Sequence, residues 1–256
     1  MSAALAGRHA LVTGGGRGIG AAIARALASQ GAVVTLLGRD RGRLDAAAAG
    51  VGAGTLAVTA DVTEPTQVEA AFDRARRAHG AIDLLINNAG EALSAPFART
   101  DAALWQRMLD VNATGAYHCI RAALPAMLDA DFGRIVNVAS TAGLTGYAYC
   151  TAYCAAKHAL VGLTRALALE LAPRNVTVNA VCPGFTDTDL VKEAVATIRR
   201  KTGRGEADAL GALVARNPQQ RLVRPEEVAN AVLWLCSPGA EAITGQSLPV
   251  AGGEVL

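Results

Sequence analysis

The sequence predicts one α/β domain with a doubly wound parallel sheet of about seven strands and helices on both of its faces. Short β-branched or apolar segments alternate with Ala- and Leu-rich helical segments along the chain. Most of the predicted strands are separated by the dozen or more residues that a crossover between parallel strands requires. No linker or repeat divides the sequence, so we expect residues 1–256 to form a single domain.

The segments expected as strands are short runs of apolar or β-branched residues. In chain order they are His9–Val12, Val33–Leu37, Leu56–Thr59, Leu84–Ile86, Arg134–Val138, Val176–Val181 and Ser247–Val250. The expected helices are Ile19–Gln30, Arg41–Ala49, Gln67–His79, Asp101–Leu128, Ala152–Leu171 and Pro225–Cys236. Pro225 suits a first helical turn, whereas Pro125 is expected to bend or end its helix because it lacks a backbone N–H.

One segment, from Thr186 to Arg221, breaks this alternation, because it is long and mostly helical where a short loop is expected. Long insertions in compact domains are usually lids or binding loops. We therefore expect residues 186–221 to form a helical substrate lid. Its basic residues, Arg199-Arg200-Lys201 and Arg204, form either a solvated helix face or a site for the phosphates of an acyl carrier.

Composition and charge exclude several classes of protein. With 52% apolar and 18% charged residues the chain is globular, and a net charge of +2 does not indicate nucleic acid or a membrane surface as a partner. The five cysteines lack zinc-site spacing, so we expect buried free thiols, no metal and a reducing compartment. Neither a signal peptide nor the ~20 apolar residues of a membrane span is found, which predicts a cytoplasmic protein.

Glycines are concentrated where the first predicted strand meets the first helix, in the segment Thr13-Gly14-Gly15-Gly16-Arg17-Gly18-Ile19-Gly20. A strand, a glycine turn and a helix N-terminus bind a pyrophosphate through backbone N–H groups and the positive end of the helix. The spacing is a variant of the strict G-x-G-x-x-G pattern. It predicts a Rossmann-type dinucleotide site with Gly14, Gly18, Ile19 and Gly20 at the phosphates.

The end of the second strand predicts which dinucleotide binds. An acidic residue about 20 positions after the loop would bind the free 2′-OH of NAD. Here the strand ends with Gly38 and Arg39, and Arg17 in the glycine loop can reach the same place. Because arginine binds phosphate in a bidentate manner, these residues favour NADP over NAD. The alternative is Asp40, which would serve NAD if the strand ran longer.

A second group of residues suggests proton transfer. Ser140 follows the strand Arg134–Val138, and Tyr153 and Lys157 are four residues apart near the start of the next helix, on one helix face. A nearby cation favours phenolate, so we expect the pKa of Tyr153 to lie below its reference of about 10. Such a tyrosine can exchange a proton with a substrate oxygen. Most Tyr-x-x-x-Lys pairs are only helix surface, so this pair gains its weight from the motifs around it.

Together these motifs resemble the short-chain dehydrogenase/reductase family over nearly the whole chain. The resemblance rests on Thr13–Gly20, Asn87-Asn88-Ala89-Gly90, Asn112, the set of Ser140, Tyr153 and Lys157, and Pro183-Gly184. One departure is Ala251-Gly252-Gly253, where family members commonly have Asp-Gly-Gly. Another is Glu91, a carboxylate that is either a solvated loop residue or a group at the substrate entrance.

The resemblance implies a role for each matching position. Tyr153 would be the general acid/base, Ser140 would hydrogen-bond the substrate carbonyl, and Lys157 would hold the nicotinamide ribose. Asn112 would support a water that completes a proton relay. The positions expected to line the cofactor from adenine to nicotinamide are Asp61, Val62, Asn88, Ala89, Gly90, Tyr153, Lys157, Pro183, Gly184 and Thr188. The resemblance also implies a homotetramer built through the two long helices, 102–124 and 152–171.

The expected substrate pocket is apolar with phenol groups, and is lined by Ser140, Ala142, Tyr147, Tyr149, Tyr153 and Phe185. This set suits an acyl or aromatic ketone. The sequence therefore predicts an NADP-dependent ketoreductase whose best candidate substrate is a 3-oxoacyl thioester of coenzyme A or a carrier protein. The alternative is a secondary or aromatic alcohol dehydrogenase. A non-catalytic nucleotide-sensing protein is a remote alternative, because such a protein would be expected to lack part of the Ser–Tyr–Lys set.

Overall fold

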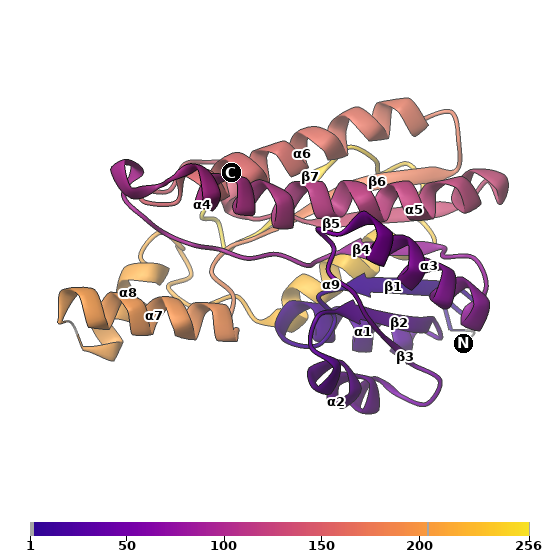
Figure 1. The fold of residues 1–256 in the computed structure, drawn as a ribbon, viewed down its shortest axis with the longest axis horizontal. Helices are drawn as coiled ribbons and strands as arrows, with labels where there is room; N and C mark the ends of the chain where they lie inside the picture. Colours follow the sequence, from indigo (N-terminus) through magenta and orange to yellow (C-terminus); the bar gives the residue numbers. More distant parts are fainter. Residues whose placement is uncertain (1–2, 204, 256) are drawn as a thin grey trace.

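The computed structural model describes residues 3–203 and 205–255 and contains a seven-stranded parallel sheet of order β3-β2-β1-β4-β5-β6-β7 (Figure 1). This confirms the doubly wound Rossmann-type fold. The strands are β1 His9–Thr13, β2 Val33–Gly38, β3 Leu56–Thr59, β4 Leu84–Asn87, β5 Gly133–Val138, β6 Val176–Pro183 and β7 Ser247–Val250. Chain order reverses beside β1, so the crevice for a ligand is expected at the carboxyl ends of β1 and β4.

Helices cover both faces of the sheet. On one face α1 (Gly18–Ser29), α2 (Arg41–Val51) and α9 (Pro225–Cys236) pack on a core that includes Ala10 and Val12 of β1. On the other face α3 (Pro65–His79), α5 (Gly115–Asp129) and α6 (Thr151–Leu171) pack on a core that includes Leu11. Successive residues of β1 thus point to opposite faces and are all buried, as the continuous apolar pattern of a central parallel strand requires.

The expected helix Asp101–Leu128 consists of three parts. Helix α4 (Ala102–Leu109) leads into a π-helical turn at Asp110–Thr114, and α5 follows directly. Pro125 lies inside α5 and does not end it. Ala123 and Met127, which are both buried, hold this part of the helix to the sheet and outweigh the loss of one helix hydrogen bond.

The segment expected as a lid projects beyond the carboxyl ends of the strands, on the left in Figure 1. It contains α7 (Asp189–Thr202) and α8 (Glu206–Val214), which pack around a small core of Val191, Val195 and Ala209. In the basic cluster, Arg199 is paired with Glu206 at 2.9 Å, and Arg204 lies outside the described residues.

The cysteines depart from one expectation. All five are free thiols, and Cys119, Cys182 and Cys236 are buried. Cys150 and Cys154 are only half-buried, because they lie at the start of α6 beside an exposed loop. In the described part of the chain, no helix combines the length and hydrophobicity that a membrane span needs.

Candidate active site

The glycine loop connects β1 to α1 at the crevice. Gly14 and Gly18 have positive φ angles of 63° and 52°, which favour glycine. At Gly20 an added Cβ would lie 2.4 Å from the Gly14 carbonyl oxygen, so the loop can pass the helix N-terminus only without a side chain there. Asn88 locks the loop from the neighbouring strand, since its Nδ2 donates to the carbonyls of Thr13 at 2.9 Å and Gly14 at 3.2 Å. The loop is a rigid cradle for a phosphate group.

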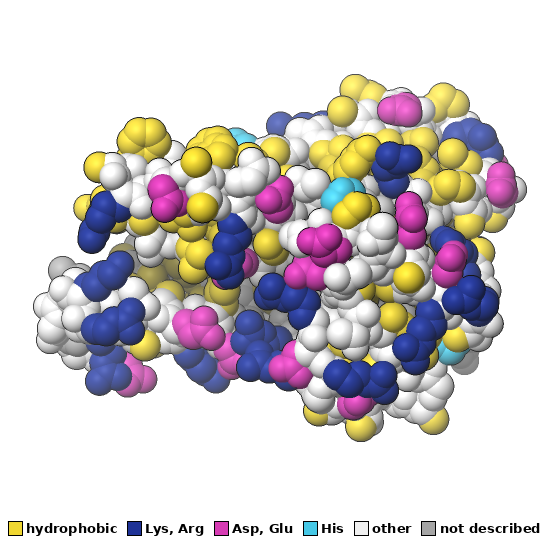
Figure 2. Space-filling model, in the orientation of Figure 1, with side chains coloured by type: hydrophobic (Ala, Val, Ile, Leu, Met, Phe, Trp, Pro, Cys, Tyr) yellow, Lys and Arg dark blue, Asp and Glu magenta, His cyan; other side chains and the backbone are white. Residues whose placement is uncertain are grey.

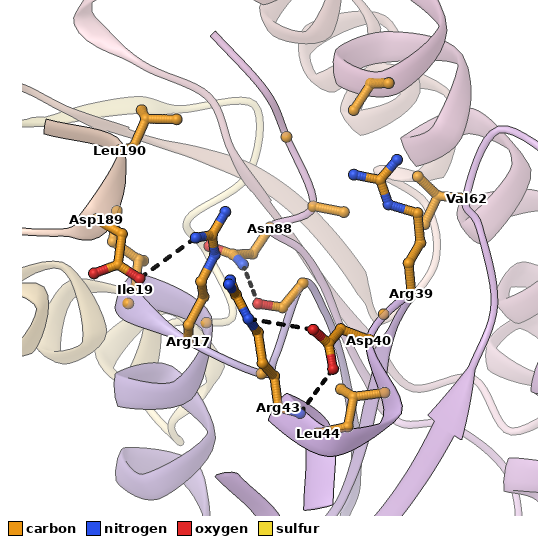
Figure 3. Close-up of a pocket in the computed structure, with 18 of the residues that line it drawn as sticks. Arg17, Ile19, Arg39, Asp40, Arg43, Leu44, Val62, Asn88, Asp189 and Leu190 are labelled. Carbon is orange, nitrogen blue, oxygen red and sulfur yellow. Dashed lines mark hydrogen bonds and ion pairs between the residues drawn. The ribbon is translucent and has the colours of Figure 1, made fainter. Parts of the chain in front are cut away.

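A cleft of about 300 Å³ opens in front of this loop (Figure 3). Most of the positions expected at the cofactor line it: Gly14, Arg17, Gly18, Ile19, Gly20, Arg39, Asp61, Val62, Asn88, Ala89, Gly90 and Thr188. Tyr153, Lys157, Pro183 and Gly184, which were also expected at the cofactor, are not part of this lining. Figure 2 shows the molecule hollowed between the α7–α8 segment and the helices above it, with Lys and Arg side chains along the rim. The cleft fits a dinucleotide through its glycine cradle and its cationic rim.

Three arginines surround the end of β2 in this cleft (Figure 3). Arg17 lies 3.4 Å from Asp189, and Arg39 lies 3.7 Å from Asp61. The third, Arg43 on the first turn of α2, was not expected from the sequence. A pattern of arginine five residues after the end of β2 is the signal that would have found it.

Asp40, the alternative partner for a free ribose hydroxyl, is engaged elsewhere. Strand β2 ends at Gly38, and Asp40 is the N-cap of α2. Its Oδ1 accepts from the backbone N of Arg43 at 3.0 Å, and its Oδ2 lies 3.3 Å from Nε of Arg43. Capping and pairing therefore direct this carboxylate toward α2.

The Ser–Tyr–Lys set lies where β5 meets α6. The Ser140 side chain lies near the Tyr153 phenol and acts to lower its pKa. Lys157 is buried, its Nζ donates to the Val138 carbonyl at 2.9 Å, and it lies 5.8 Å from the centre of the Tyr153 ring. Gly90 connects this set to the cleft, because a Cβ added there would lie 3.5 Å from the Lys157 ammonium.

Burial determines the proton affinities of this set. It raises the pKa of Tyr153 to about 12, although the hydrogen bond from Ser140 opposes the rise. It also lowers the pKa of Lys157 to about 8. The expectation of a lowered tyrosine pKa is therefore wrong for this structure, because loss of solvent around the phenolate outweighs the ammonium. Tyr153 is protonated at neutral pH, as a proton donor must be.

Asn112 occupies the π-helical turn between α4 and α5, a distortion that often marks functional sites. Its Nδ2 donates to the carbonyls of Glu91 at 2.8 Å and Met108 at 3.0 Å, and its Oδ1 accepts from the Glu91 backbone N at 3.2 Å. Glu91 itself is partly buried and paired, since Arg107 binds its carboxylate in a bidentate manner at 2.7 and 2.9 Å. These contacts fix the segment after Gly90.

The residues expected at the substrate pocket lie in the loop after β5 and at the end of β6. Ala142 is buried beside Ser140, and Tyr147 packs edge-on against Phe185 with ring centres 6.1 Å apart. Tyr149 is 65% exposed and has a positive φ of 66°. Two further groups at Tyr147, Glu254 and Arg216, were missed because they come from distant parts of the sequence.

The chain is similar to proteins of known family. A family model described as enoyl-(acyl carrier protein) reductase matches residues 14–254. The chain belongs to the short-chain dehydrogenase/reductase family. It is 41% identical to the cis-4-hydroxycyclohexanecarboxylate dehydrogenase of Sinomonas cyclohexanicum, over 99% of this chain and 98% of that protein. It is 38% identical to the 3-oxoacyl-[acyl-carrier-protein] reductase of Aquifex aeolicus, over 99% of both.

A solved structure of this family is also similar. A crystal structure of a variant of the actinorhodin polyketide ketoreductase with NADPH covers 96% of this chain and 97% of its own, at 37% identity and a TM-score of 0.93. The protein is thus an oxidoreductase of the short-chain dehydrogenase/reductase family that acts on CH–OH or C=O groups with a nicotinamide cofactor.

Proposed function

We propose that this short-chain dehydrogenase/reductase is an NADPH-dependent ketone reductase, with a 3-oxoacyl thioester as the first candidate substrate. The observation that carries the choice of NADPH is the engagement of Asp40 by Arg43 of α2, which leaves Arg17 and Arg39 as the cationic partners around the end of β2. A 2′-phosphate needs cationic partners, whereas a free 2′-OH needs an acceptor. The NADPH in the similar ketoreductase structure supports the same choice.

The existing ion pairs of the arginines do not oppose phosphate binding. The side chains of Arg17 and Arg39 are 49% and 67% exposed, and exposed pairs contribute about 0–1 kcal/mol. A charge-assisted hydrogen bond to phosphate contributes about 1.5–3 kcal/mol. Arg17 and Arg39 would therefore exchange Asp189 and Asp61 for the 2′-phosphate, while Asp61 and Val62 remain beside the adenine.

The roles of the catalytic residues follow from their positions. Bound NADPH supplies the hydride. Ser140 donates a hydrogen bond to the ketone oxygen, and Tyr153, protonated because its pKa is about 12, donates the proton that this oxygen takes up. Lys157 holds the nicotinamide ribose, and Asn112 orders the segment after Gly90 and the water relay beside it.

The position of the nicotinamide follows from the loop after β6. Thr188 lies next to the glycine loop, since a Cβ added to Gly18 would be 3.2 Å from its Cγ2. In the proposed complex Thr188 bonds the carboxamide, and Pro183 and Gly184 support the ring. The segment 186–221 closes over the substrate as a lid.

The thioester is supported by the apolar walls around Ala142 and Phe185 and by relatives named for 3-oxoacyl and ketoacyl reduction. A second candidate is the oxidation of a secondary alcohol on a ring. It is favoured by the relative named for cis-4-hydroxycyclohexanecarboxylate. Purified protein would be offered acetoacetyl-CoA, cyclohexanone derivatives and aromatic ketones with NADPH and with NADH. If only ring substrates are turned over, the ring alcohol replaces the thioester as the first candidate substrate. If no ketone or alcohol is turned over, the proposed function is wrong.

We also propose a cytoplasmic homotetramer. Exposed apolar residues lie on three helices: Trp105 on α4, Tyr117 on α5 and Leu169, 80% exposed, on α6. Such surface is typically covered by another subunit. Light scattering at micromolar concentration should give the mass of four chains, and a monomer would contradict the proposal.

A further inference from the structure

Tyr147 is held on three sides by groups from separate parts of the chain. Its hydroxyl donates to Oε1 of Glu254 and lies 2.7 Å from the hydroxyl of Thr141. The Arg216 guanidinium lies over its ring, 4.4 Å from the centre. The loop before α6, the end of the lid segment and the C-terminal tail therefore meet at this phenol.

The C-terminal tail, residues 252–254, packs closely against the end of the lid segment. At Gly252 a Cβ would lie 2.2 Å from Oδ1 of Asn217, and Gly252 has a φ of 62°. Asn217 is itself buried and bonded to the Arg221 carbonyl at 2.9 Å. The tail thus follows the root of the lid closely, and this close approach sets the position of Glu254.

The second oxygen of Glu254 is directed at Gly184, which directly follows β6. A Cβ at Gly184 would lie 2.8 Å from its Oε2. In the described part of the chain, no ion pair and no hydrogen bond to Oε2 is found. Arg216 does not neutralise this carboxylate by a direct ion pair, since its Nη1 donates to the Gly146 carbonyl at 3.2 Å. The half-buried carboxylate of Glu254 therefore lies beside Gly184 without a direct ion pair to a cation.

We propose that Glu254, acting with Tyr147, determines substrate specificity by selecting neutral ketones over ketones that carry a carboxylate. This inference rests on the proposed function. A ketone oxygen at Ser140 and Tyr153 directs one substituent along Thr141 to the Tyr147 ring. A negative charge on that substituent approaches the unpaired Glu254 carboxylate and is repelled, whereas an ester or thioester at the same place is not. The enzyme therefore takes esterified or thioesterified oxo acids and rejects the free acids.

The test compares ethyl acetoacetate with acetoacetate, two ketones that differ in one charge, using NADPH. The wild-type protein should have the higher kcat/KM for the ester. In Glu254→Gln, which keeps a hydrogen-bond acceptor for Tyr147, the ratio of the two kcat/KM values should fall about threefold or more, as expected for a partly screened charge. The change should lie in KM for the acid, with NADPH affinity unaltered. Glu226→Gln on α9 makes the same chemical change on an exposed surface and should leave the ratio unchanged.

A double-mutant cycle tests the contact itself. The effects of Tyr147→Phe and Glu254→Gln on urea stability should be non-additive if the two side chains are coupled. An ester-to-acid ratio in Glu254→Gln equal to that of the wild type would overturn the proposal. A wild-type protein inert with every ketone would overturn the proposed function and the selection with it, while the coupling in the cycle would still report the pairing of Tyr147 with Glu254.

Discussion

The cofactor cleft and the proposed substrate pocket are held by different kinds of contact. In the cleft, the backbone of α1 passes close to the glycine loop at Gly20 and Gly14, and the side chain of Asn88 binds the backbone carbonyls of Thr13 and Gly14. In the pocket, side chains far apart in sequence meet, as where Tyr147 contacts Glu254. A backbone cradle tolerates little change, whereas a wall of side chains can be replaced one residue at a time. The cleft can thus serve one cofactor while the pocket changes its substrate.

The largest effect is expected where the two regions meet. Tyr153→Phe removes the proton donor and keeps the ring, so kcat should fall by at least ~10², the scale of general acid catalysis. NADPH binding, followed by fluorescence titration, should be retained because the cleft is unchanged. Turnover near that of the wild type would contradict the role of this phenol.

Lys157→Ala should affect both regions at once. In the proposed function the side chain holds the cofactor ribose, and it lies 5.8 Å from the centre of the Tyr153 ring, so both NADPH affinity and kcat should fall by about tenfold or more, the loss of one charge-assisted hydrogen bond. Unchanged NADPH affinity would show that Lys157 does not reach the ribose.

The same residue predicts a pH dependence. Burial lowers the pKa of Lys157 to about 8, so its charge is present below this pH and is lost as the pH rises through it. The kcat/KM for ketone reduction, which reports the free enzyme, should therefore be level below pH 8 and decline above it. In Lys157→Arg the decline should disappear, since arginine keeps its proton. A decline that persists in this variant belongs to another group.

Much of the fold and the cleft follows from the sequence, because local signals carry them. The strands are continuous apolar runs. The residues of the glycine loop that are expected at the phosphates are adjacent in the chain. The π-helical turn at Asp110–Thr114 and the continuation of α5 past Pro125 depend on tertiary packing, which outweighs local propensity. The raised pKa of Tyr153 depends on burial, which the spacing of Tyr153 and Lys157 does not report. Glu254 has no signal at all, because it reaches Tyr147 from 107 residues away.

The smallest effect compares two glycines in helices. Gly20→Ala places a methyl group 2.4 Å from the Gly14 carbonyl oxygen, so it should lower the free energy of unfolding by about 1–3 kcal/mol and weaken NADPH binding. Gly50→Ala, on α2, meets nothing within 4 Å and should raise stability by about 0.5–1 kcal/mol through helix propensity. Urea unfolding measures both. Equal effects at the two positions would show that the cradle is looser than described.

The central claim is the preference for NADPH, and one titration tests it most directly. The affinities for NADPH and NADH would be measured for the wild-type protein, for Arg39→Ala and for Gly38→Asp combined with Arg39→Ala. The wild type should bind NADPH more tightly. The double variant should lose about ten- to hundredfold in NADPH affinity, the loss of one charge-assisted bond, and should hold or gain affinity for NADH. Equal affinities of the wild type for both cofactors, or an equal loss for both in Arg39→Ala, would contradict the account and assign the enzyme to NAD.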